Sequence, residues 1–235
     1  MRGAHIGAAV AALALTAASA QATPVAFTKL TGLTGGSPAA TGVYEGILTG
    51  NGMIQSITIQ DNSFGLGGAA GQFSGFDLDA IVLSYTDISD ASQVGTLVPL
   101  AVFDFGSATG TIFSPGAQRL PVDPKLFGTD ATGTHVDNTV ATLGSFDANS
   151  ATTIPPAFGF VSMGDGGTIT FNLTSPVDST NLHIYIGEVG DNGEVAAGSI
   201  FVSQDRVDPN AVPEPATLTL LGTGLLAAAR ARRRK

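Results

Sequence analysis

The chain has 235 residues, a formal net charge of −9 and no cysteine, so disulfide bonds cannot hold its fold together. Its charge is unevenly placed: residues 23–211 contain four basic and 18 acidic residues, whereas five of the ten basic residues lie at positions 230–235. The resulting net charge of −14 for residues 23–211 argues against a partner that is nucleic acid or anionic lipid.

The first 22 residues have the layout of a secretory signal peptide. Arg2 and His5 form a short polar start, and residues 6–18 form an apolar core rich in alanine, leucine and valine. Two small-residue cleavage sites follow, at 18–20 and 20–22. We therefore expect residues 1–22 to form a signal helix that directs export of the chain.

Residues 23–203 are expected to form a single β-domain. Alternation of apolar and polar residues predicts strands at 57–60, 168–173, 182–186 and 199–203. Apolar runs predict more deeply buried strands at 79–85 and 97–105, with a further candidate at 139–146.

Glycine-rich turns separate these segments, and no segment shows a helical period with capping residues. The pattern predicts an all-β, antiparallel sandwich or jelly-roll body with a long loop at 106–135 and a linker at 204–212.

Two acidic segments are candidate calcium sites. The candidate ligands are Asp77, Asp79, Glu188, Asp191, Asn192 and Glu194. The first two lie two residues apart in a predicted strand and are therefore expected on one face, while the other four lie at an expected hairpin tip. Oxygen donors of these types bind calcium, although the hairpin segment lacks a full calcium-loop series. The alternative for the first pair is two solvated carboxylates, or a turn role for Asp77, and the alternative for the second segment is a hairpin tip that binds no ion.

Other catalytic or metal-binding patterns are not found. His5 leaves with the signal peptide, and His135 and His183 lie far apart without a zinc-type spacing. No cysteine nucleophile, nucleophile elbow, phosphate-binding loop or dinucleotide motif is present. We expect no cofactor other than calcium, and we place His183 on the outward face of its strand.

The C-terminal segment has three parts. Pro213 and Pro215 flank Glu214 in an extended tripeptide, because proline fixes φ and removes a backbone donor. Residues 216–229 carry no charge and could form a helix about 21 Å long, which is short for a bilayer core of about 30 Å. The basic residues that follow, expected on the cytoplasmic side, are Arg230, Arg232, Arg233, Arg234 and Lys235.

This arrangement resembles the PEP-CTERM protein-sorting signal, whose C-terminal segment is also labelled an ice-binding protein C-terminal motif. The resemblance covers residues 212–235 and implies a Gram-negative bacterium that makes exopolysaccharide. It also implies an inner-membrane-tethered precursor, held by a transmembrane helix at 213–235 and processed near the tripeptide by an exosortase. The mature protein is then expected at the cell surface or outside the cell.

Three classes of function remain open for the body. The first is a non-catalytic surface or matrix protein associated with exopolysaccharide or biofilm. The second is a module that binds carbohydrate or another surface, although tryptophan is absent and there are only three tyrosines to stack on sugars. The third is a glycan hydrolase that uses a carboxylate pair such as Asp77 and Asp79. The first class is our prediction.

Overall fold

The computed structural model describes residues 22–35, 40–50, 52–63, 65–150, 157–194 and 200–210. The expected signal helix, apart from Ala22, and the sorting segment at 213–235 lie outside the described residues, so the helices expected there stay predictions. Within the described ranges, no helix is long and apolar enough to cross a membrane.

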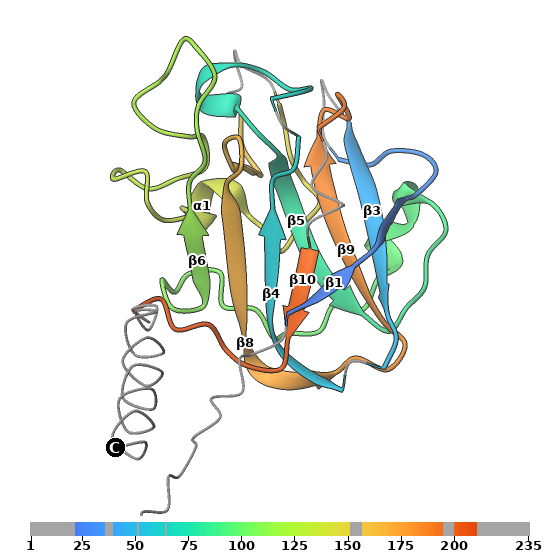
Figure 1. Ribbon diagram of the computed structural model, residues 1–235. Coiled ribbons are helices and arrows are strands. Elements are labelled where there is room, and N and C mark those ends of the chain that lie inside the picture. The colour runs from blue at the N-terminus through green and yellow to red at the C-terminus, as the bar shows by residue number, and fades with distance from the viewer. Residues whose placement is uncertain are drawn as a thin grey trace, which may run out of the picture.

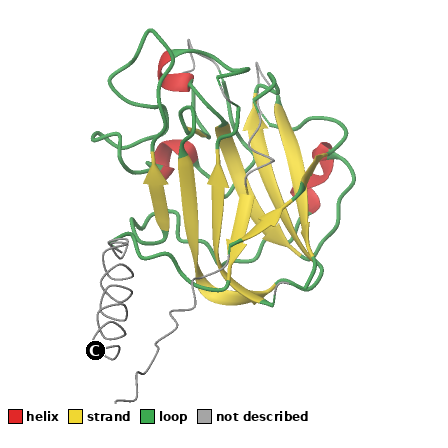
Figure 2. Ribbon diagram, viewed as in Figure 1, coloured by secondary structure: helices red, strands yellow, loops and turns green. Residues whose placement is uncertain are grey.

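The described residues form two five-stranded antiparallel sheets with very little helix (Figures 1 and 2). The first sheet has the order β1 (Thr23–Val25), β10 (Ile200–Ser203), β4 (Met53–Gln60), β8 (Thr168–Asp178) and β6 (Thr111–Ser114). The second has the order β2 (Phe27–Lys29), β3 (Thr41–Leu48), β9 (Leu182–Val189), β5 (Asp77–Ser84) and β7 (Val161–Ser162). The short helical segments are η1 (Gly71–Phe73), η2 (Ala91–Thr96) and α1 (Asn138–Ala141). The prediction of a mostly β, antiparallel body is therefore confirmed.

The main hydrophobic core joins the two sheets. Alternate residues of β4 and β8, such as Ile57 and Phe171, pack in one cluster with alternate residues of β9, such as Ile184 and Ile186. This follows from the side-chain period of two along a strand, which sends every second residue to the same face. The alternating segments of the sequence are thus the ones that build the core between the sheets.

The outer face of the second sheet is also covered. The loop after β5, which contains η2, packs Ile88, Ala91 and Leu97 against Val43 of β3 and Tyr185 of β9. Every residue of β9 is consequently buried, although its sequence alternates. An alternating pattern shows that a strand has two different faces, but it does not show whether a loop covers the more polar one.

Three of the sequence predictions for secondary structure were wrong. Residues 97–105 form no strand, and residues 139–146 contain the end of α1 followed by turns. The predicted loop at 106–135 contains the strand β6.

Strand β3 was missed because two glycines interrupt its apolar pattern. A Cβ at Gly46 would lie 2.7 Å from the Phe27 ring and from Val25, so glycine is required where these side chains cross the strand.

The core contact between β8 and the segment 103–105 gives a test of this packing. Phe171 is 1% exposed and meets Phe103 and Phe105 edge-on, with ring centroids 5.6 and 5.9 Å away. Phe171→Ala should lower the free energy of unfolding by about 3–5 kcal/mol in chemical denaturation, because it leaves a cavity. Val98→Ala, at a side chain that is 68% exposed, should change it by less than about 0.5 kcal/mol. Equal effects would contradict this assignment of the core.

Candidate functional site

The structure separates the two predicted calcium ligands of β5. Asp77 accepts a hydrogen bond from the Ser162 hydroxyl of β7. Asp79 accepts one from the Thr41 hydroxyl at 2.9 Å and faces the backbone amides of Asp147 and Ala148, each 3.2 Å away. The two carboxylates therefore bind different segments, and each serves as an internal hydrogen-bond acceptor.

The four predicted ligands of the second acidic segment also separate. Asp191 forms an ion pair with Lys29, and the side-chain oxygen of Asn192 accepts a hydrogen bond from the Gly68 amide at 3.0 Å. Glu188 and Glu194, by contrast, are completely buried. Only these two of the four turn into the interior.

Asp77, Glu188 and Glu194 form what we call the buried acid group. Their exposed fractions are 6%, 0% and 0%. Glu188 lies opposite Leu78 of β5 in the register of the sheet. It follows Ile184 and Ile186 at every second position of β9, so its side chain points inward and is buried. Neither carboxylate oxygen of Glu188 has a partner in full hydrogen-bond geometry among the described residues, and the Asp191 backbone amide only partly opposes the rise of its pKa. An unpaired carboxylate in this position is costly if it is charged.

Burial is the largest cause of a raised pKa in each member of the group. It raises the pKa of Asp77 well above its ordinary value, that of Glu188 to about 9 and that of Glu194 to about 7. The neighbouring carboxylate of Glu194 adds to the rise at Asp77 and Glu188, while a hydrogen bond from Arg119 opposes it at Glu194. Glu188 is therefore a neutral carboxylic acid at neutral pH.

Arg119 connects the group to its surroundings. Its guanidinium donates to Glu194 at 3.0 Å and to the Gly67 carbonyl, and its Nε lies 3.2 Å from Asp165 Oδ1. The single positive charge of Arg119 is shared between Glu194 and Asp165. Burial and repulsion between the carboxylates therefore still favour the protonated forms in the buried acid group. Among the described residues, the three members of the buried acid group do not place one ligand oxygen each within 4.8 Å of the other two, as residues that surround one ion together would. Calcium binding here stays a prediction.

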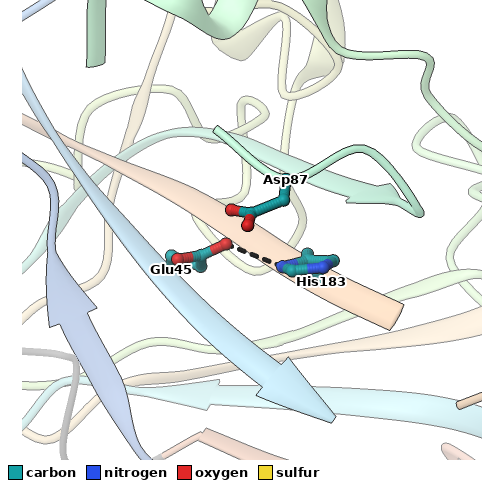
Figure 3. A group of neighbouring side chains, drawn as sticks. All are labelled: Glu45, Asp87 and His183. Carbon is teal, nitrogen blue, oxygen red and sulfur yellow. Dashed lines mark hydrogen bonds and ion pairs between the residues drawn. The ribbon is translucent and has the colours of Figure 1, made fainter. Parts of the chain in front are cut away.

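A second constellation, which the sequence did not suggest, lies on the outer face of the second sheet. Glu45 of β3, Asp87 of the loop after β5 and His183 of β9 place one ligand atom each within 4.8 Å of the other two (Figure 3). His183 Nδ1 and Glu45 Oε1 are 2.7 Å apart, and the Tyr185 hydroxyl donates to the same Glu45 oxygen at 2.8 Å.

The sequence does not reveal this trio, because Asp87 is 42 positions after Glu45, His183 is 96 positions after Asp87, and the three share no local spacing. The one available signal was the alternation of β9, which correctly placed His183 on the face opposite Leu182, Ile184 and Ile186. That face is covered, however, and His183 is only 8% exposed.

A surface hollow of about 560 Å³ lies beside β6 and the start of α1. Phe105 and the side chains of Asp130, His135 and Asn138 are among the residues that line it. Hydrogen bonds, first of all from the Thr132 hydroxyl, lower the pKa of Asp130 to about 2, so this carboxylate is ionised at neutral pH. The size falls in the range of small-ligand sites, roughly 300–1,000 Å³.

The comparisons with known proteins concern the C-terminal segment. Residues 211–235 match the family model described as the PEP-CTERM protein-sorting motif. This chain carries a PEP-CTERM sorting motif. The motif implies a secreted protein that an exosortase processes and that reaches the cell surface, as the sequence analysis expected. No curated protein and no solved structure matches the chain.

The raised pKa values predict how stability depends on pH. The unfolded chain ionises Glu188 near pH 4.5, whereas the folded chain keeps its proton until about pH 9. The contribution of Glu188 to the free energy of unfolding is therefore fully present below about pH 4.5 and is lost as the pH rises to about 9. The melting temperature should fall across that interval. Glu194 and Asp79, each with a pKa raised to about 7, should add to the fall below pH 7.

Glu188→Gln tests this assignment, because glutamine is neutral and similar in shape. At about pH 9 the variant should be more stable than the parent by an amount on the order of a few kcal/mol, and at about pH 5 the two should be nearly equal. Asp104→Asn, which removes an exposed carboxylate, is the control and should leave the pH profile unchanged. A profile that is unchanged in Glu188→Gln would contradict the assignment.

Proposed function

We propose that this chain is an exported, non-catalytic protein of the cell surface or extracellular matrix that associates with exopolysaccharide or biofilm. The observation that carries the proposal is the sorting motif at 211–235, which follows an acidic two-sheet body. Before processing, the apolar residues 216–229 tether the precursor to the inner membrane, and an exosortase then acts near Pro213, Glu214 and Pro215.

The placement of the acidic residues supports a non-catalytic role. A glycan hydrolase needs two carboxyl groups that its substrate can reach. Asp77 and Asp79, the pair that the sequence offered, are 6% and 0% exposed and are engaged by Ser162 and Thr41. A polysaccharide chain cannot reach them in this fold, which argues for a structural use of both.

The delivery route can be tested in the producing bacterium. Deletion of residues 213–235 should lower the fraction of the protein at the cell surface, measured by cell fractionation and immunoblotting. Replacing Pro213, Glu214 and Pro215 with alanine keeps the apolar run and the basic end, and should likewise block processing. A surface fraction unchanged in both variants would overturn the proposed route.

The hollow beside β6 favours a second candidate function, the binding of a carbohydrate. It combines the half-buried ring of Phe105 with an ionised carboxylate and the imidazole of His135, whose side chain is 53% exposed. One apolar surface with a few polar groups is the composition of many ligand sites. This function would give the exported body a means of attachment to exopolysaccharide.

His135→Ala tests the carbohydrate hypothesis without disturbing the core. The His135→Ala variant should be retained several-fold more weakly than the parent chain on exopolysaccharide purified from the same bacterium, because a polar contact of the hollow is lost. Phe158→Ala removes an exposed aromatic side chain elsewhere and should bind as the parent does. Equal retention of all three proteins would exclude His135 from glycan binding.

A further inference from the structure

We propose that Glu45, Asp87 and His183 bind a divalent transition-metal ion, with zinc as the preferred ion. The three side chains come from β3, the segment after β5, and β9, and Figure 3 shows them gathered around one small space. The site is independent of the sorting motif and of the carbohydrate hypothesis. The sequence did not suggest this site, because its three ligands share no short spacing.

The donor atoms select the class of ion. One imidazole nitrogen and two carboxylate oxygens form a mixed set that zinc accepts, with three protein ligands and a fourth position left to water. Calcium and magnesium take oxygen ligands, so the imidazole nitrogen favours a transition metal over either of them. This distinguishes the site from the six residues that the sequence offered for calcium, none of which belongs to the trio.

The geometry is close to what a zinc ion needs. Ligands of a tetrahedral zinc lie about 2.1 Å from the metal and therefore about 3.4 Å from one another. The distance from His183 Nδ1 to Glu45 Oε1 is 2.7 Å, so a small side-chain rotation would open room for the ion. The proton shared in that hydrogen bond would leave when the metal binds, as it does when imidazole becomes a ligand.

A single hydroxyl group holds two of the three ligands in place. Tyr185 OH donates to Glu45 Oε1 at 2.8 Å, accepts from the Ile88 amide at 3.2 Å and lies 2.9 Å from the Thr86 carbonyl. Asp87 lies between the latter two residues, so the same hydroxyl fixes Glu45 and the backbone on both sides of Asp87. Hydrogen bonds of this kind orient the ligands of established metal sites.

No lysine or arginine of the described residues forms an ion pair with Glu45 or Asp87. Lys29 pairs with Asp191, Arg119 pairs with Asp165 and Glu194, and Lys125 donates to backbone carbonyls. Asp87 makes no hydrogen bond or ion pair with the described residues and is exposed, whereas the Glu45 and His183 side chains are 12% and 10% exposed. A cation can therefore enter from the side of Asp87 and be held by two less accessible ligands.

Zinc titration of the secreted chain by isothermal calorimetry tests the proposal. We expect one zinc site that calcium does not occupy, and an affinity for zinc at least about tenfold weaker in His183→Gln and in Asp87→Asn. Asp87→Asn is the decisive variant, because it removes a ligand without removing a hydrogen bond, so its melting temperature without metal should equal that of the parent. This guards against a loss of affinity that reflects unfolding.

His135→Gln is the matched control, because this exposed histidine also lies near one carboxylate, with Nδ1 3.4 Å from Asp130 Oδ2. It should bind zinc as the parent does. The proposal is overturned if Asp87→Asn or His183→Gln binds zinc with unchanged affinity. It is equally overturned if His135→Gln weakens binding as much as they do, since the zinc then binds elsewhere.

Discussion

Strand β9 is buried on both faces, and this burial limits which side chains the centre of the second sheet can hold. β9 lies between β3 and β5, its inward residues join the core between the sheets, and the segment with η2 covers its other face. Every polar side chain of this strand therefore needs a partner or must be neutral. His183 and Tyr185 find partners on the outer face, whereas Glu188 has none in full hydrogen-bond geometry in the described chain and keeps its proton instead.

The two sides of β9 place acids in two different environments: Glu188 lies on β9 itself, and Glu45 lies on the neighbouring β3. On the inward side, burial raises the pKa of Glu188, so that this end of the core contains a carboxylic acid in place of a charge. On the outward side, Glu45 receives two hydrogen bonds and remains close to Asp87 near the surface. The same residue type is structural in one position and available to a ligand in the other, because solvent reaches only the second.

Much of the fold could be predicted from the sequence, because a side-chain period of two is a local property. The alternating pattern identified strands at the positions of β4, β8, β9 and β10, and in β9 it placed His183 on the face opposite Leu182, Ile184 and Ile186. The strand β3 could not be found, because Gly46 is required by Phe27 and Val25, which approach it from another part of the chain. Residues 97–105 are apolar for a different reason: they pack on the edge of the core without joining a sheet.

The export route is specified by a linear segment, the sorting motif at 211–235, and the acidic charge and β character of the body are likewise properties of composition and local pattern. Which acids meet depends on the tertiary structure. Asp77 and Asp79 are neighbours in sequence yet bind different segments, while Glu45, Asp87 and His183 are distant in sequence and converge. The physical reason is that strand pairing and loop covering, which are long-range, set the distances between side chains and their exposure to water.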